Sequence, residues 1–253
     1  MGRGPQGGDR DVEWVLILGL GVAAGTVGGV IGFGASIMLL PALVWSFGAK
    51  DTIPIMAIAA LMANASRVAV WWREVDWKLN AVHCATAVPA AVLGARTLLS
   101  LNAAMVEGAL GVFLLMSIPG RRWLVHRGFR MSLPGMALVG GVIGYLTGIV
   151  ASTGPINTPF FLAYGLTKGS FIASEALGSA AISLTKAATF HAFGALSPAT
   201  LWRGLTIGVA LMLGSWISKH ILMALDASRF QIIIEAMMVA AGLWMVSGAL
   251  GLL

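Results

Sequence analysis

Long apolar runs with few charges dominate this chain and restrict what it can fold into. A membrane-spanning helix needs about 20 mostly apolar residues, and eight runs come close to that length: 12–31, 53–72, 79–99, 103–119, 131–151, 170–193, 198–223 and 229–252. Of the 253 residues, 58% are hydrophobic and 10% charged, whereas a soluble domain carries roughly 25% charged residues. A soluble core of this size cannot bury so much apolar surface. The sequence therefore predicts an all-α polytopic membrane protein.

The charged residues and the cysteine content exclude other classes of function. The net charge of +6 comes from 16 Lys and Arg against 10 Asp and Glu. In a membrane protein such an excess is expected in cytoplasmic loops, so it indicates contact with the bilayer and not with nucleic acid. The single cysteine, Cys84, excludes an internal disulfide and a cysteine-based metal cluster. We expect no metal and no cofactor.

A basic loop divides the chain almost in half. It carries Arg121, Arg122, Arg127 and Arg130, so the positive-inside rule places it in the cytoplasm. We predict a polar tail at 1–11, a first group of transmembrane helices at 12–119, a basic cytoplasmic linker at 120–130 and a second group at 131–253.

The two halves share a pattern of interruptions. Each contains a short apolar stretch with proline, 33–47 and 155–166. The second would measure roughly 18 Å as a helix, too short for a hydrocarbon core of about 30 Å. Each stretch follows a Gly-rich or polar break, predicted at 31–36 and 151–158. Paired interruptions of this kind are typical of secondary transporters. They predict two homologous halves, arranged as inverted repeats, with broken half-helices meeting near the membrane midplane.

The topology depends on how many times each half crosses the membrane. An odd number gives inverted repeats with both termini outside, and an even number gives parallel repeats with both termini inside. The loop Lys and Arg residues divide equally well in the two arrangements. Inversion is favoured because half-helices at the midplane usually accompany it.

Two cations lie at matching positions within long apolar runs. An offset of 119 aligns Arg67 with Lys186. A charge at the bilayer centre costs about 2.5–3.5 kcal/mol, so each cation either extends to the interface or serves a function. Near a pseudo-twofold axis the two would hold an anion between them. Hydrogen-bond donors lie within one turn of each, namely Ser66, Thr185, Asn64 and Ser183.

The predicted breaks supply further candidate ligands. Helix N-termini attract anions through their N–H groups and dipole, and the breaks contain Ser36, Gly34, Thr153, Gly154 and Asn157. Ser36, Thr153 and Asn157 are equally interpretable as helix caps, a role that is compatible with ligand binding.

Three other residues are candidates for gating or proton transfer. Glu175 lies inside an apolar run and is interpretable either as a solvated helix start or as a proton-linked group. His191 aligns with Trp72 across the two halves. The alternative roles are a core histidine for His191 and an interfacial anchor for Trp72.

Four segments in order resemble the TauE/SafE sulfite exporter family, also called the TSUP family. They are Gly28-Gly29-Val30-Ile31-Gly32-Phe33-Gly34 before Pro41, Trp71-Trp72-Arg73-Glu74-Val75-Asp76-Trp77, Gly148-Ile149-Val150-Ala151-Ser152-Thr153-Gly154-Pro155 before Pro159, and Ala176-Leu177-Gly178-Ser179. The resemblance covers both halves, with two departures. Ala59-Ala60-Leu61 stands where a first-half Gly-Thr-Ser is expected, and Thr153-Gly154-Pro155 replaces a run of glycines. The resemblance implies transport of sulfite, sulfonates or other small sulfur anions.

The predicted function is a secondary transporter that exports sulfite or a related sulfur oxyanion or organosulfonate. Transport would proceed by alternating access around a midplane anion site, in a multi-pass protein of the bacterial inner membrane. One alternative is an anion channel, with weak binding at several sites. Another is an intramembrane serine protease that uses Ser36 with His83 or His191. The protease is disfavoured because Ile37 follows Ser36 where a glycine is wanted.

Overall fold

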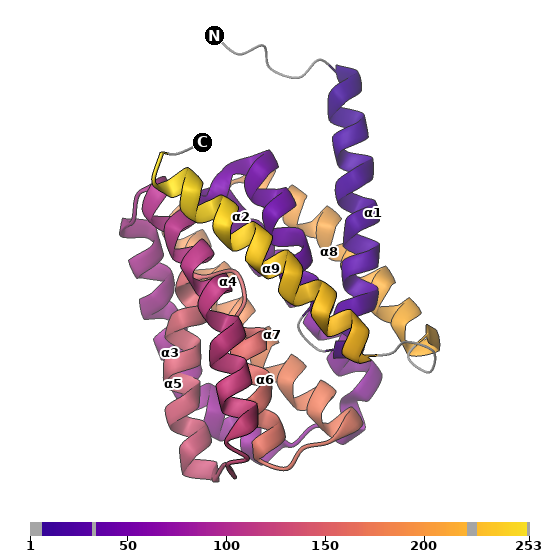
Figure 1. The fold of residues 1–253 in the computed structure, drawn as a ribbon, viewed down its shortest axis with the longest axis vertical. Helices are drawn as coiled ribbons and strands as arrows, with labels where there is room; N and C mark the ends of the chain where they lie inside the picture. Colours follow the sequence, from indigo (N-terminus) through magenta and orange to yellow (C-terminus); the bar gives the residue numbers. More distant parts are fainter. Residues whose placement is uncertain (1–6, 32–33, 222–226, 252–253) are drawn as a thin grey trace.

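The protein is built from helices, as the apolar runs predict. The computed structural model describes residues 7–31, 34–221 and 227–251 (Figure 1). Over this part it contains no strand, and its helices are α1 Gly7–Ile31, α2 Gly34–Trp71, the 3-10 helix η1 Trp72–Glu74, α3 Trp77–Ser100, α4 Ala103–His126, α5 Leu133–Ile149, α6 Gly154–Ala163, α7 Lys168–Ala192, α8 Pro198–Ile221 and α9 Ala227–Ala249. Four described segments are long and apolar enough to cross a membrane, Ala35–Glu74, Trp77–Ser100, Ala103–His126 and Pro198–Ser218. The all-α membrane class is confirmed.

Large apolar side chains cover much of the outer surface. Val15, Leu93, Leu138 and Trp216, on four different helices, are all more than half exposed. A soluble protein rarely exposes apolar surface on this scale. These side chains are therefore positioned to contact lipid.

Close crossings of small residues hold the helices together in pairs. At Gly94 of α3, an added Cβ would collide with the carbonyl oxygen of Tyr145 in α5. At Gly25 of α1, it would collide with the carbonyl oxygen of Leu211 in α8. Lipid provides no hydrophobic drive for helices to associate, so such close backbone contact stabilises the pairs through packing.

Two helix boundaries differ from the sequence prediction. Helix α1 begins at Gly7, inside the predicted tail at 1–11. Helix α4 continues through Pro119 to His126, so more than half of the predicted linker at 120–130 is helical. Transmembrane helices tolerate an internal proline because its neighbours compensate for the one backbone bond it removes. The extension is also anchored, since Arg121 forms an ion pair with Glu235 of α9 at 3.7 Å.

Each half contains a short helix near its start. In the first half, α2 changes direction at Gly48, whose φ of 79° and ψ of 158° separate residues 34–47 from 49–71. In the second half, the ten-residue α6 ends before Gly165, with φ of 107°, and α7 follows. Of the predicted break at 151–158, residues 151–153 lie between α5 and α6, and residues 154–158 form the start of α6. The predicted break at 31–36 lies between α1 and α2, and its residues 32–33 are outside the described residues.

The helices alternate in direction between two ends of the molecule. Figure 1 shows the start of α1 and the end of α9 at the upper end, and the connection between α4 and α5 at the lower end. The first half, α1 to α4, therefore runs from the upper end to the lower one. The second half, α5 to α9, runs back.

Candidate functional site

A small polar cavity lies where the two short helices approach the long ones. It offers about 50 Å³ to the centres of water-sized molecules, which is room for a few waters. Helices α1, α2, α5, α6, α7 and α8 all contribute to its wall. Its polar side chains are Ser36, Asn64, Arg67, Thr147, Ser152, Thr153, Asn157, Glu175, Ser179, Ser183 and Ser215.

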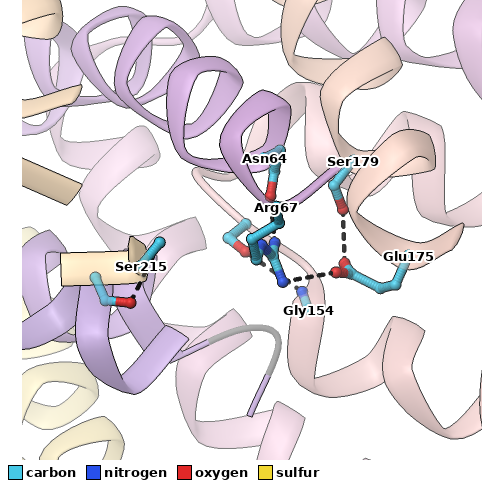
Figure 2. A network of polar contacts seen from close by, with 8 residues as sticks. Asn64, Arg67, Gly154, Glu175, Ser179 and Ser215 are labelled. Atoms are coloured by element: carbon cyan, nitrogen blue, oxygen red, sulfur yellow. Dashed lines mark hydrogen bonds and ion pairs between the residues drawn. The ribbon is translucent and has the colours of Figure 1, made fainter. Parts of the chain in front are cut away.

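The charged centre of the cavity is an ion pair between the two halves of the chain. Arg67 of α2 is 9% exposed and Glu175 of α7 is 2% exposed. Figure 2 shows the guanidinium between Asn64 and Glu175. One guanidinium nitrogen, Nη1, lies 3.3 Å from Oε2 of Glu175, and the other, Nη2, donates to Oδ1 of Asn64. The cavity therefore contains one positive and one negative group.

Glu175 lies deep in the protein and not at a solvated helix start. Helix α7 begins at Lys168, about two turns earlier. Ser179, one turn further along the same helix, donates a hydrogen bond of 2.7 Å to Oε1 of Glu175. Oε2 accepts no hydrogen bond from the described residues, although it is within ion-pair distance of Arg67. Ser179 thus holds one carboxylate oxygen by a hydrogen bond, and Arg67 pairs with the other by charge.

The first turn of α6 forms another part of the wall, but most of its N–H groups are already used. Gly154 N–H points to the Ser152 hydroxyl at 3.4 Å, and the N–H groups of Ile156 and Asn157 donate to the Thr153 carbonyl. Thr153 precedes the helix without capping it through its side chain. Asn157 is buried, and its Oδ1 has no hydrogen-bond partner among the described residues. An anion here would be attracted by the helix dipole and by side chains rather than by free N–H groups.

Lys186 does not line this cavity together with Arg67. It is 1% exposed, and its ammonium donates a hydrogen bond of 2.8 Å to the carbonyl of Val150. Val150 follows the last residue of α5, where helix carbonyls lack intrahelical partners and attract cations. The next residues, Ala151 to Thr153, line the cavity. Lys186 therefore lies behind the wall that Arg67 faces.

Helical geometry explains why other candidates lie outside the cavity. Asn64 is three positions from Arg67 and shares its face, whereas Ser66 is the preceding residue and points elsewhere. Thr185 stands in the same relation to Lys186, and its hydroxyl donates to the Ala181 carbonyl at 2.8 Å. Neither Ser66 nor Thr185 lines the cavity.

The remaining candidates have separate surroundings. Trp72 and His191 are exposed, and Trp72 contacts Trp77 edge-on, with 4.7 Å between ring centroids. Gly34 begins α2, and its surroundings lie outside the described residues. Neither His83 nor His191 lines the cavity with Ser36, so the structure brings no histidine to that serine there.

The ion pair between Arg67 and Glu175 was not predicted from the sequence. Ser179 and Ser215 were not proposed as site residues either. The offset of 119 was the available signal. Five pairs of lining residues differ by 119 in residue number. They are Gly28 and Thr147, Ala35 and Gly154, Ala60 and Ser179, Ala63 and Ile182, and Asn64 and Ser183. The cavity therefore takes residues from both halves of the chain, and five pairs of them align at the predicted offset.

Comparison with known proteins gives one match. The family model described as "Sulfite exporter TauE/SafE" matches residues 17–245. No curated protein and no solved structure matches the chain. The matched range runs from α1 to α9 and includes every residue of the cavity. On this match over nearly its whole length, the chain belongs to the TauE/SafE sulfite exporter family.

Proposed function

We propose that this protein is a secondary transporter that exports sulfite or a closely related sulfur oxyanion or organosulfonate across the bacterial inner membrane. The observation that carries the proposal is the buried cavity between the two halves, with the Arg67 guanidinium in its wall. Buried charges within membrane helices are costly, and they commonly mark substrate pathways.

The chemistry of the cavity suits a small oxyanion. A guanidinium presents its N–H groups in a planar fork that can hold two oxygens of one ligand. The hydroxyl groups of Ser36 and Ser183 line the same space and can donate to the remaining oxygens, whereas that of Ser215 donates to the Gly25 carbonyl at 3.3 Å. The start of α6 and the charge of Lys186 behind the wall add positive potential. We therefore assign Arg67 as the principal anion ligand, with Asn64, Thr153, Gly154 and Asn157 around it.

Inverted repeats and alternating access form the second part of the proposal. The five lining pairs separated by 119 residues support a pseudo-twofold axis through the cavity. The two halves also run in opposite directions between the ends of the molecule (Figure 1), as inverted repeats require. Rocking of one half against the other would open the cavity to each side in turn. We place the connection between α4 and α5 in the cytoplasm, because it carries Arg127 and Arg130.

Ligand binding tests the anion site. A ligand that binds only the folded state raises its apparent stability. Purified protein should be heated with sulfite, sulfate, thiosulfate, sulfoacetate, taurine or chloride. We expect sulfite or another sulfur anion to raise the melting temperature, and chloride to have the smaller effect. Equal shifts for chloride and all the sulfur anions would contradict the proposed substrate class.

Variants of Arg67 test its role. Charge-assisted hydrogen bonds contribute roughly 1.5–3 kcal/mol each, so Arg67→Ala should weaken sulfite binding roughly ten- to a hundredfold. Arg67→Lys should restore it in part, because the fork is lost. The matched control is Arg96→Ala, since Arg96 stacks on Phe193 at 5.3 Å and lies outside the cavity. Unchanged binding in a folded Arg67→Ala protein would refute the assignment.

Transport kinetics distinguish a carrier from a channel. In proteoliposomes, a carrier that alternates access should release labelled sulfite faster when unlabelled sulfite is present on the opposite side. A channel shows no such stimulation. Sulfite flux that unlabelled sulfite does not stimulate would contradict alternating access and indicate conduction through a channel.

A further inference from the structure

Arg67, the proposed ligand for the anion, is already paired with a carboxylate. Arg67 faces Glu175 at 3.3 Å, and both side chains are buried. We propose that Glu175 is the proton acceptor of transport: the incoming anion replaces its carboxylate at Arg67, and Glu175 takes up one proton as this happens. The inference rests on the proposed function and adds the ion to which transport is coupled.

Charge balance is the first argument. The unliganded pair is neutral overall, and removing an isolated charge from water is costly. An anion that enters beside an ionised Glu175 places two negative groups at Arg67, the one cation of the described residues that faces the cavity, because the Lys186 ammonium is bonded to the Val150 carbonyl behind the wall. Uptake of one proton by Glu175 removes one of those negative charges and ends the competition for the guanidinium.

The contacts of Glu175 fit an exchange of partners. Its Oε2 is paired with Arg67 by charge and accepts no hydrogen bond from the described residues, so the contact that the anion must replace is this ion pair. Its Oε1 is bonded to the Ser179 hydroxyl at 2.7 Å. That hydroxyl can donate to a carboxylate or accept from a carboxylic acid. Asn64 holds the guanidinium from the other side, which keeps Arg67 in the cavity when Glu175 is released (Figure 2).

The neighbouring helices place other titratable groups around α7. His83 of α3 lies against Gly178, on the turn between Glu175 and Ser179. Its Nδ1 lies 3.4 Å from the Met136 carbonyl. Nearer the start of α7, Glu74 of η1 contacts Gly169, and the backbone N–H of Asp76 donates to Ser174.

Glu175 contacts Arg67 directly. From α5 and α6, the cavity receives the uncharged side chains Thr147 and Asn157. His83 is the competing proton acceptor, because it is buried nearby. Glu74 contacts Gly169 at the start of α7, and the Asp76 carboxylate caps α3 by accepting from the N–H of Leu79.

The proposed step balances in charge and atoms. On the side where the anion enters, the Glu175 carboxylate gains a proton from water and becomes a carboxylic acid, while the anion oxygens take its place at Arg67. After the halves reorient, the anion leaves, the acid returns its proton to water and the ion pair forms again. One proton thus moves in the same direction as each anion.

Infrared difference spectroscopy tests this step in the complete protein. Addition of sulfite to the wild type should produce the carbonyl band of a protonated carboxylic acid. Glu175→Gln should lack this band. The matched controls, Glu107→Gln on α4 and His83→Gln on α3, should retain it. A wild-type spectrum without the band, while sulfite binds, overturns the proposal whether or not any variant folds.

Binding as a function of pH provides the second measurement. Where the free protein keeps Glu175 ionised, uptake of one proton per anion weakens wild-type binding about tenfold for each pH unit of increase. Glu175→Gln should lose this dependence on pH. The two proteins are compared at the same pH, because the protonation of sulfite itself then affects both equally. Identical dependence in the two proteins, or its loss only in His83→Gln, overturns the assignment. Absence of sulfite binding by the wild type would instead refute the proposed function.

Discussion

The Arg67–Glu175 pair should make a large, non-additive contribution to stability. We consider Arg67→Gln, Glu175→Gln and the double variant, all without anion. At the observed separation of 3.3 Å, two unit charges in an effective dielectric of about 20 attract by about 5 kcal/mol. Removing one partner of a buried pair typically costs about 3–5 kcal/mol, because the remaining charge is left uncompensated.

The two single variants should lose different amounts of stability. Arg67→Gln leaves the Glu175 carboxylate with Ser179 as its described hydrogen-bond donor, so we expect it to cost about 3–5 kcal/mol. Glu175→Gln keeps an amide oxygen for the guanidinium and should cost less. Replacing both members of a buried pair is often nearly neutral. The double variant should therefore be more stable than the sum of the single losses, by about 3 kcal/mol.

Thermal unfolding of the four proteins in the same detergent measures this coupling. For a domain of 150–250 residues, 1 kcal/mol corresponds to roughly 2–4 °C in melting temperature. The double variant should thus melt roughly 6–12 °C above the value that addition of the single effects gives. Additive losses would refute the reasoning, because they would mean that the two charges do not stabilise each other.

Four further predictions follow from individual contacts. Gly94→Ala should lower the melting temperature, because its Cβ would collide with the Tyr145 carbonyl and overpacking typically costs about 1–3 kcal/mol. The control is Gly141→Ala, which should have little effect because the nearest atom to its Cβ would be 3.9 Å away. Asn157→Asp should weaken sulfite binding at least about tenfold by adding a negative charge to the cavity wall, whereas Asn157→Ser should have a smaller effect. In a Cys84→Ser background, Arg127→Cys should react with an impermeant thiol reagent from the cytoplasmic side and Ala199→Cys from the opposite side; the reverse pattern would invert the topology. Ser36→Ala should alter sulfite uptake, and peptide cleavage that depends on Ser36 would instead favour the protease.

The sequence by itself determined the class of the protein and most of its helices. Lipid cannot satisfy backbone N–H and C=O groups, so each crossing must be a long apolar helix, and that requirement is visible in one local stretch of residues. The interruption before Gly154 was visible for the same reason, whereas the change of direction at Gly48 was not predicted. Spacing along a single helix also placed Asn64 on the face of Arg67, because residues three apart are neighbours on a helix.

Only the tertiary structure decided which groups meet. The direction in which a helix turns its polar residues depends on packing against its neighbours, and apolar runs contain little information about that rotation. Packing brings Glu175 to Arg67 across the two halves, and it directs Lys186 to the Val150 carbonyl at the end of α5. Arg67 and Lys186 align at the sequence offset of 119, yet they have different partners. Each contacts the nearest opposite full or partial charge, which is the Glu175 carboxylate for Arg67 and the end of α5 for Lys186.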